Sequence, residues 1–340
     1  MRRTVAPLRG RRLLFLSPYA DRPLYGGAVV RIHHLVRELC RRNQVWWVTR
    51  GPLQGPPPEG LAGHLAASPT RWRQLFDPLL VLRLARAIRR HRIELILAST
   101  WIAGLHGVLL KHLSGRPLVL DEHNVEFRLT PWLRGWEGFL CRQADEVWGV
   151  SADDLADLSA SFGLKRLRLV PNGAEPGSQG DRSRARQRLG LPRERPVALF
   201  FGVLRYAANR EAVELVLSEL APRLPDFEFL VAGVGCEQFQ ERANVRLLGF
   251  VDDLSVLLAA CDVVIVPLRT GSGTRLKVLE ALAAGRPVVS TSLGVAGLEV
   301  SGVRVEDDWD AFAEAVRTAP GASPPELPER YRWERIVEAL

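Results

Sequence analysis

The sequence predicts an α/β protein built from two doubly wound parallel sheets, one in each half of the chain. In both halves short apolar runs alternate with amphipathic helical stretches, which is typical of parallel strands joined by helical crossovers. A segment rich in Gly, Pro, Ser, Asp and Arg, residues 171–196, interrupts this alternation near the middle. The length of 340 residues suits two domains of about 150 residues each.

The first half begins with a compact apolar strand and a glycine turn, Gly26-Gly27. A helix is expected over 28–42, because apolar residues recur there on one face, and a basic amphipathic helix over 75–91. The strands expected in this half are 13–17, 45–48, 95–98, 118–121, 146–150 and 167–170. This part of the chain, 1–173, is therefore predicted to form the first domain.

The second half repeats the alternation after a linker, 174–195, that carries a short helix. The expected strands are 197–202, 227–232, 245–248, 263–267 and 287–290, and the expected helices are 212–220, 254–260 and 277–284. These elements predict a second domain over 196–325, followed by a terminal helix, 326–340, that crosses back to the first domain. Ligands of such sheets bind beyond the carboxyl ends of the strands, so we expect the functional residues there.

The composition is that of a soluble globular enzyme, with 47% hydrophobic and 25% charged residues. Polar residues break the most apolar stretch, 95–113, so it is predicted as a strand running into a helix and not as a membrane span. The basic start, 1–12, precedes too short an apolar segment for a signal peptide, which favours the cytoplasm. The four cysteines are scattered without paired spacing, and we expect them to be buried thiols.

The formal net charge of +8 allows two interpretations. Basic clusters attract an anionic membrane, a nucleotide diphosphate or an acidic acceptor, or they simply cover solvated helix faces. The helix over 75–91 has the same two alternatives, lying against a membrane at its inner face or packing on the sheet with its arginines outward. Nucleic acid is not expected as a partner, because aromatic residues do not alternate with the basic clusters.

The most informative segment runs from Pro267 to Thr291. A strand is expected to end there and a loop containing Gly271, Ser272 and Gly273 to lead into a helix that begins near Thr274. Amides at a helix start bind anions, the glycines let a ligand approach the backbone, and Arg275 and Lys277 add positive charge. Glu280, one turn further on, could accept two ribose hydroxyls. The alternative is an ordinary strand–turn–helix in which the glycines only make the turn.

The same segment resembles the donor-site signature of glycosyltransferase family 4, in particular Leu279-Glu280-Ala-Leu-Ala-Ala-Gly285-Arg-Pro-Val-Val. The resemblance implies the GT-B arrangement, two Rossmann-like domains facing across a cleft, and retaining transfer from a nucleotide diphosphate sugar. It implies that Glu280 holds the ribose. The family pattern has another glutamate eight positions earlier, where this chain has Ser272. That departure leaves the donor sugar undefined.

The resemblance extends over nearly the whole chain. It implies that Gly26 and Gly27 form a glycine loop facing the phosphates, that His123 lies against the donor sugar, and that Arg205 and Arg210 grip the diphosphate. Further matching segments are 144–147, 150–154, 170–173, 200–205, 231–235, 248–251 and 331–335. We therefore expect His123 and Arg205 to be catalytic. We expect the donor to contact Gly26, Gly27, Arg205, Arg210, Gly271, Ser272, Gly273, Thr274, Lys277 and Glu280.

The sequence thus predicts a hexosyltransferase-type enzyme of polysaccharide or glycolipid biosynthesis, whose acceptor is a glycan, a lipid-linked saccharide or a small molecule. Two other functions remain open: a nucleotide-sugar isomerase using His123 and Glu122, and a weakened nucleotide-sugar binder that assists another enzyme, which Ser272 would favour. No cofactor is expected. Asp308 and Asp310 have the spacing of a metal-binding pair, but we predict that they cap the helix that follows and that no metal is bound.

Overall fold

The computed structural model describes residues 7–24, 26–68, 70, 77–177, 180–271 and 275–340. It contains two compact units, Met1–Asn172 with Trp333–Leu340, and Gly173–Arg332. Each unit has one parallel sheet and its own hydrophobic core. The predicted α/β class with two doubly wound sheets is confirmed.

The first unit has a seven-stranded sheet in the order β3-β2-β1-β4-β5-β6-β7. Its strands are β1 (Arg12–Leu16), β2 (Gln44–Arg50), β3 (Leu61–Ala67), β4 (Leu95–Ser99), β5 (Leu118–Asp121), β6 (Glu146–Gly149) and β7 (Leu167–Leu169). Every pairing is parallel. The central strands β1, β4 and β5 are buried almost throughout, which explains their continuous apolar runs.

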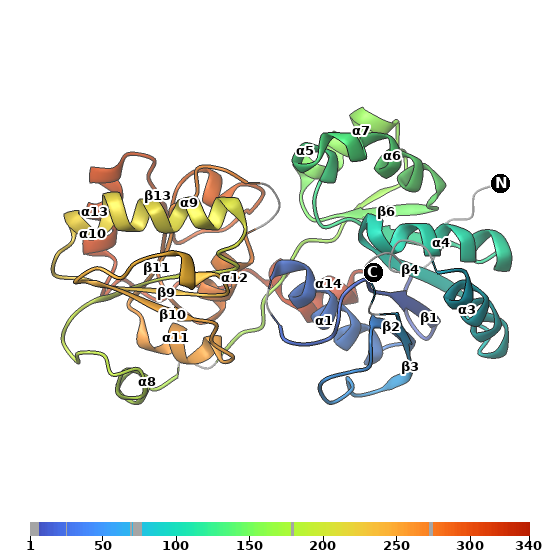
Figure 1. Ribbon diagram of the computed structural model, residues 1–340, viewed down its shortest axis with the longest axis horizontal. Helices are drawn as coiled ribbons and strands as arrows, with labels where there is room; N and C mark the ends of the chain where they lie inside the picture. The colour runs from blue at the N-terminus through green and yellow to red at the C-terminus, as the bar shows by residue number, and fades with distance from the viewer. Residues whose placement is uncertain (1–6, 25, 69, 71–76, 178–179, 272–274) are drawn as a thin grey trace. The chain divides into compact units, whose positions relative to one another are not determined.

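Helices cover both faces of this sheet (Figure 1). They are α1 (Gly27–Cys40), α3 (Pro78–Arg90), α4 (Thr100–Ser114), α5 (Glu126–Leu129), η1 (Pro131–Leu133), α6 (Arg134–Gln143), α7 (Ala152–Phe162) and α14 (Trp333–Glu338). Helix α1 packs with α14, whereas α4 packs between α3 and α6. Connections from β1 to β2 and from β4 to β5 run in opposite directions, so right-handed crossovers place α1 and α4 on opposite faces.

The second unit has a six-stranded parallel sheet in the order β10-β9-β8-β11-β12-β13. The strands are β8 (Val197–Phe201), β9 (Glu228–Ala232), β10 (Val245–Gly249), β11 (Val263–Val266), β12 (Val288–Ser290) and β13 (Val303–Val305). The helices are α8 (Arg182–Arg188), α9 (Ala207–Leu215), η2 (Val216–Leu220), α10 (Ala221–Arg223), η3 (Cys236–Gln238), α11 (Leu254–Ala260), α12 (Leu276–Ala283), η4 (Leu293–Val295), α13 (Trp309–Thr318) and η5 (Glu329–Tyr331). Helices α9 and α13 lie on one side of the sheet and α8 and α11 on the other (Figure 1).

The segment 174–195, expected as a linker with a short helix, lies in the second unit and contains α8. Arg186 of α8 is buried, and its guanidinium donates to the carbonyls of Ala260 and three residues of the following loop and binds the Asp262 carboxylate at 2.5 Å. A charged side chain with this many partners ties α8 firmly to α11 and to the end of the sheet. The terminal helix α14, by contrast, belongs to the first unit.

Two smaller expectations are also resolved. All four cysteines are buried and free, as expected. The Asp308 carboxylate accepts from the amides of Asp310 and Ala311 and so caps α13, as predicted. No helix in the described part of the chain is long and apolar enough to cross a membrane.

Candidate donor and acceptor sites

The carboxyl ends of β8 and β11 form the point where the second sheet changes direction. These strands are neighbours, yet the chain leaves β8 toward β9 on one side and β11 toward β12 on the other. A crevice opens at such a point in doubly wound sheets, and ligands bind in it. The two segments that border it are the turn from Gly202 to Tyr206 and the segment from Pro267 to the start of α12.

Lys277, in the first turn of α12, is held at this point by two contacts. Its Nζ donates to the Asn209 Oδ1 at 2.8 Å and lies 4.1 Å from the centre of the Phe200 ring. The Asn209 amide in turn donates to the Val203 carbonyl at 2.9 Å, which fixes the acceptor that Lys277 uses. The lysine therefore presents a positioned cation beside the turn that follows β8.

Gly202 is required for this arrangement. Its φ is 154°, which side-chain-bearing residues rarely adopt. A Cβ there would also lie 3.0 Å from the Asn209 Nδ2 and 3.4 Å from the Lys277 Nζ. The glycine thus leaves room for the cation above the strand end.

The ionisable groups on α12 are perturbed by their surroundings. Burial, and then the neighbouring Arg275, lower the pKa of Lys277 to about 7, against a smaller opposing effect of Glu280. Burial raises the pKa of Glu280 to about 7, and Lys277 opposes that shift. A phosphate near Lys277 would restore its positive charge, and hydroxyl donors near Glu280 would stabilise its carboxylate. Shifted pKa values of this kind cluster at functional sites, which makes these two residues candidates for ligand contacts.

The other residues expected at the donor site are distributed around this centre. Gly271, with φ 110°, lies on the β11 side, where an added Cβ would be 3.0 Å from the Ala208 Cβ. The Arg205 side chain is 70% exposed and its guanidinium binds the Glu237 carboxylate at 2.9 Å. Arg210 is exposed in the first part of α9. Ser272, Gly273 and Thr274 lie outside the described residues, and α12 begins at Leu276.

In the first unit the equivalent change of direction lies between β1 and β4. Gly26, with φ 82°, is the N-cap of α1, and Gly27 begins that helix. Directly after β4, Thr100 has φ 63°, an unfavourable conformation for a β-branched residue. Backbone strain of this kind concentrates at functional sites, and this instance lies beside the strand end that carries Ser99.

His123, two residues beyond the end of β5, belongs to a buried polar network. Its Nε2 lies 2.9 Å from the Ser99 Oγ and 3.0 Å from the Asp121 Oδ2. Within the described part of the chain its Nδ1 makes no hydrogen bond, although the residue is buried. The ring is therefore oriented through one nitrogen and leaves the other for a ligand.

Arg31 of α1 completes this network. Its guanidinium contacts the Asp121 carboxylate through Nη2 at 2.6 Å and Nε at 3.2 Å, and its Nη1 donates to Pro171 O and Asn172 Oδ1 at 3.1 Å. Although burial alone would raise the pKa of Asp121, Arg31 and His123 outweigh it and hold that pKa well below its usual range. Asp121 is thus a fixed anion that orients His123.

Glu122 does not join His123 as a second group at the site. Its carboxylate is buried and makes no hydrogen bond among the described residues, though the Trp101 amide is close enough to lower its pKa slightly. Burial, followed by repulsion from Glu137, Glu126 and Asp121, raises that pKa well above the usual value. Its surroundings therefore disfavour the charged form of this acid.

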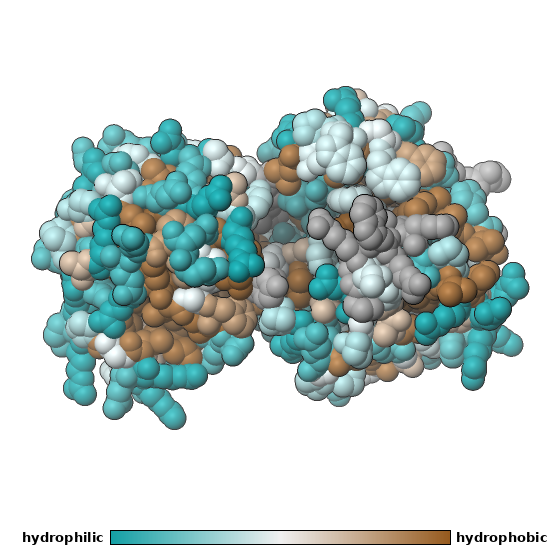
Figure 2. Space-filling model, viewed as in Figure 1, coloured by the Kyte–Doolittle hydropathy of each residue, from teal (hydrophilic) through white to brown (hydrophobic). Residues whose placement is uncertain are grey.

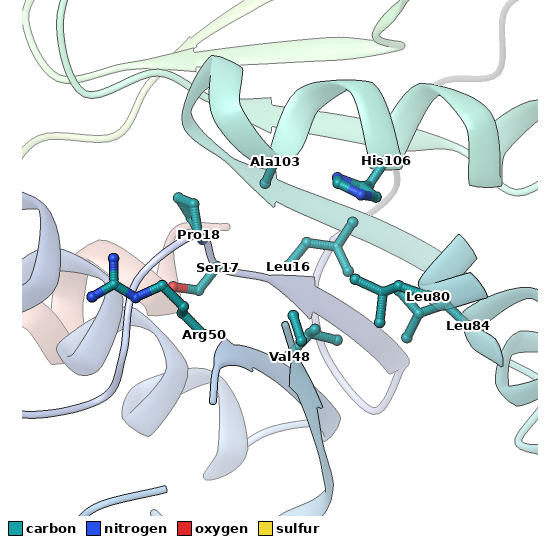
Figure 3. A pocket seen from close by; sticks show the side chains of 10 residues that line it. Leu16, Ser17, Pro18, Val48, Arg50, Leu80, Leu84, Ala103 and His106 are labelled. Atoms are coloured by element: carbon teal, nitrogen blue, oxygen red, sulfur yellow. The ribbon is translucent and has the colours of Figure 1, made fainter. Parts of the chain in front are cut away.

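A small, mainly apolar pocket also lies at this edge of the first sheet (Figure 3). It is lined by Leu16, Ser17, Pro18, Val48, Arg50, Ala67, Leu80, Leu84, Ala103 and His106. The His106 ring is held by the Asp77 amide, which donates to its Nε2 at 3.1 Å. Arg50, Ser17 and His106 supply the polar part of the lining.

Sequence reasoning missed Asn209 and Ser99 as site residues. Ser99 is the last residue of β4 and Asn209 lies in the first turn of α9, and their partners His123 and Lys277 are distant in the chain. Among the described residues no cluster of three or more His, Cys, Asp or Glu side chains has the geometry of a metal site.

Comparison with known proteins places this geometry in a family. The model of Glycosyltransferase Family 4 matches residues 25–177, and that of Glycosyl transferases group 1 matches residues 195–319. Together the two matches cover most of both units. The crevice at β8 and β11 lies within the second match, and the His123 network lies within the first.

Individual relatives and solved structures agree. D-inositol 3-phosphate glycosyltransferase of Corynebacterium jeikeium is 27% identical over 297 residues, covering 73% of this chain and 71% of the relative. Phosphatidyl-myo-inositol mannosyltransferase of Mycolicibacterium smegmatis is 31% identical over 227 residues, covering 58% and 57%. The structure of Anabaena HepE in complex with UDP and glucose superposes with a TM-score of 0.76 at 21% identity, covering 97% of this chain and 98% of that one. That structural likeness supports the GT-B fold. The chain belongs to glycosyltransferase family 4.

Proposed function

We propose that this glycosyltransferase takes its sugar from a nucleotide diphosphate sugar held by the second unit. The observation that supports this most strongly is Lys277, a positioned cation at the switch point, with Glu280 one turn along the same helix. A diphosphate needs cationic partners and a ribose needs a hydroxyl acceptor, and α12 provides both types of group. The complex of HepE with UDP and glucose is in line with such a donor.

In this proposal the diphosphate is stabilised as it departs by Lys277, Arg205 and the backbone amides of the glycine loop, so no metal or other cofactor is required. Because the pKa of Lys277 is about 7 in the free protein, donor binding would take up a proton when it occurs above that pH. We therefore expect donor affinity to fall as the pH rises from about 7 to about 9.

We propose retention of the anomeric configuration, with the acceptor attacking from the face that the diphosphate leaves. The acceptor hydroxyl would pass its proton to the departing phosphate oxygen while the anomeric carbon–oxygen bond breaks, so charge and atoms balance. His123 would bind the donor sugar through Nδ1, since Nε2 is already held by Ser99 and Asp121. Attack from that face retains the configuration without the covalent intermediate on a protein carboxylate that retaining glycosidases form.

For the acceptor we propose a hydroxyl of a glycan, a lipid-linked saccharide or a small molecule, with peripheral contact to an anionic membrane. Relatives named for inositol phosphate and phosphatidylinositol support a polyol hydroxyl. On α3, Leu79 and Leu82 are exposed beside Arg83, whereas Leu80 is buried toward the core, so the outer face of this helix is both apolar and basic. Trp72, Leu75 and Phe76 lie outside the described residues.

A thermal-shift screen tests the donor proposal. UDP-, GDP- and ADP-sugars are added with EDTA in place of metal, and each is repeated with Glu280→Ala and with Glu314→Ala, an exposed acid on α13, as the matched control. A ligand at 100 times its Kd stabilises by about 2.7 kcal/mol, or roughly 5–10 °C in a domain of this size. One nucleotide series should shift the wild type and the control but not Glu280→Ala. No shift with any series would overturn the proposal.

The weakened-binder alternative rests on Ser272 in the donor loop. It is tested by measuring release of nucleoside diphosphate from the donor that gives the shift, with and without polyol acceptors. Turnover that is lost in Lys277→Ala supports the transferase. Binding without any release, even slow hydrolysis, would favour the binder.

A further inference from the structure

The outer face of η1 and α6 in the first unit carries an unusual group of exposed side chains. Leu129 is 42% exposed, Trp132 77%, Trp136 36% and Phe139 40%. We call these four residues the aromatic ridge. Leu129 ends α5, Trp132 lies in η1, and Trp136 and Phe139 lie in α6, which Figure 1 draws close to α5. In this part of the first unit Figure 2 shows pale and brown residues among the teal ones.

Helical geometry explains why this face is exposed. Trp136 and Phe139 are three residues apart in α6 and so share one side of that helix, and Trp132 lies in the preceding 3-10 turn η1. The opposite side of α6 is buried against α4 and α7 through Glu137, Leu140 and Cys141 and their neighbours. The Trp136 and Phe139 rings stack at 5.7 Å, so the ridge is ordered by its own contacts. Contiguous exposed apolar surface of this kind marks an interaction site.

The charged side chains around the ridge are mostly basic. Arg128, Arg134 and Arg142 are exposed along the ridge, whereas Glu137 is buried and caps α5 by accepting from the Glu126 and Phe127 amides. Arg134 lies over the Phe127 ring at 5.1 Å, which keeps its charge beside the aromatic surface. The neighbouring α7 contributes two acids. Asp157 is already paired with Arg128, and Asp153 is exposed.

At the C-terminal end of α6 the ridge leads to a basic groove. It is lined by Cys141, Arg142, Ala144, Asp145, Val147, Phe162, Gly163, Leu164, Lys165 and Arg166. The one acid in this lining, Asp145, is paired with Lys111 at 2.9 Å and accepts from the Leu118 amide. Three basic side chains therefore surround a hollow large enough for a phosphate headgroup.

We propose that the aromatic ridge and the basic groove together form the surface by which this protein docks on an anionic lipid bilayer. Tryptophan rings partition into the interface between headgroups and acyl chains, and arginine and lysine beside them bind the lipid phosphates. Both features are required, and the groove, with Arg142, Lys165 and Arg166, adjoins the end of the helix that carries Trp136 and Phe139. A protein partner or a second copy would not need the excess of basic side chains around this surface.

The surface is separate from the donor site and from the outer face of α3. The docking proposal therefore does not depend on the donor proposal, and either can fail while the other holds. It assigns the peripheral membrane contact of the proposed function to this surface and not to the outer face of α3, and the two helices can be altered independently.

Vesicle flotation tests the proposal with the full-length protein. The vesicles contain one-third phosphatidylglycerol in phosphatidylcholine, or phosphatidylcholine alone, and the variants are Trp132→Ala/Trp136→Ala and Arg142→Gln/Lys165→Gln. The controls are Leu79→Ala/Leu82→Ala on α3 and Val305→Ala in the second unit, all exposed. Since each basic side chain near the surface contributes about 1 kcal/mol, the charge variant should bind roughly 25-fold more weakly. We expect the tryptophan variant to lose at least about tenfold.

The proposal is supported if the wild type binds only the anionic vesicles, the tryptophan and charge variants lose binding as expected, and Val305→Ala binds like the wild type. The proposal is overturned if the wild type does not float with anionic vesicles. It is equally overturned if only the α3 variant loses binding, since α3 would then be the docking helix. Light scattering adds a third arm: concentration-dependent self-association that disappears in Trp132→Ala/Trp136→Ala would make the ridge an interface between copies instead. Unchanged thermal stability of the variants establishes that they fold.

Discussion

At the scale of single residues, the proposed donor site contains groups whose ionisation costs stability in the free protein. Lys277 and Glu280 both have a pKa near 7, displaced from 10.5 and 4.5 by burial. Each shift means that the charged form is less stable in the fold than in the unfolded chain. This is what is expected where residues are placed for a ligand and not for stability.

We predict that Glu280→Gln stabilises the free protein at high pH. Between pH 4.5 and about 7 the folded state keeps a proton on Glu280 that the unfolded chain releases. The stability of the fold that depends on this proton is therefore fully present below pH 4.5 and is lost as the pH rises through about 7. Glutamine stays neutral throughout. The variant should match the wild type near pH 5 and melt roughly 2–4 °C higher near pH 8, which is what about 1 kcal/mol gives in a domain of this size.

Differential scanning fluorimetry across this pH range, without nucleotide, provides the measurement. Glu314→Gln, on the exposed surface of α13, is the control and should show no such dependence. Parallel melting curves for wild type and Glu280→Gln at all pH values would show that Glu280 titrates normally.

We predict a large loss of stability when the ion pair between Arg31 and Asp121 is broken. Both side chains are only 1% exposed, so Asp121→Leu leaves a buried guanidinium without its main counter-ion. The expected cost is about 3–5 kcal/mol, and Arg31→Met/Asp121→Leu should recover most of it. Urea denaturation of both variants measures this. A cost below about 1 kcal/mol for Asp121→Leu would show that water or a shift of Arg31 replaces the carboxylate.

At the scale of elements, helix starts in the first unit depend on specific side-chain caps. The Ser151 Oγ accepts from the Asp154 amide at 3.1 Å and donates to the Asp154 carboxylate at 2.7 Å at the start of α7. The same residues follow β6 directly, so this cap sets where the chain turns from strand to helix. Helices α4 and α7 both end at glycines in the left-handed conformation, Gly115 and Gly163.

We predict that Ser151→Ala destabilises the first unit by about 1 kcal/mol, because the Asp154 amide loses its acceptor. Ser161→Ala, which removes a hydroxyl from the last turn of the same helix, should cost less than about 0.5 kcal/mol. Urea titration of both variants compares them directly. Equal effects would mean that Asp154 or water satisfies the helix start without Ser151.

At the scale of the whole molecule, each unit has its own core, and the chain ends in the first one. Trp333 of α14 is 1% exposed, and its ring stacks on His34 of α1 at 5.4 Å. Burial also lowers the pKa of His34 to about 3, so this contact holds a neutral ring throughout the physiological range. The last residues of the chain are thus part of the core of the unit that contains the first residues.

We predict that Trp333→Ala destabilises the first unit by about 3–5 kcal/mol and leaves the second unit unchanged. Differential scanning calorimetry should show a lower melting temperature for the first unit. The transition of the second unit, identified because a bound nucleotide sugar raises it, should not move. A single transition that moves as a whole would show that the two units unfold cooperatively.

The sequence alone determined the elements whose burial follows a regular local pattern. Strands such as β5 and β11 are buried on both faces, so their residues form continuous apolar runs, and both lie within a residue of the predicted bounds. The edge strands β3 and β13 were not predicted. They are only partly buried and contain Gly63, His64 and Arg304, so no apolar run identifies them.

Individual candidate residues could be named from the sequence where a motif carries them, as for Glu280, Lys277 and His123 in the stretches that resemble the family. Their partners were not. Lys277 and its acceptor Asn209 are 68 positions apart, and Arg31 and Asp121 are 90 apart. Arg205, expected at the diphosphate, is bound to Glu237, a residue that no local pattern connects to it.

The sequence by itself therefore determined the class, the repeated strand–helix alternation, the family and the helix that carries the donor motif. Only the tertiary structure decided which loops meet at each switch point, how His123 is oriented and which face of α6 is exposed. The physical reason is that burial and helical periodicity act between near neighbours in the chain, whereas these contacts depend on the order of the strands in each sheet. That order brings strand ends together that no local pattern relates.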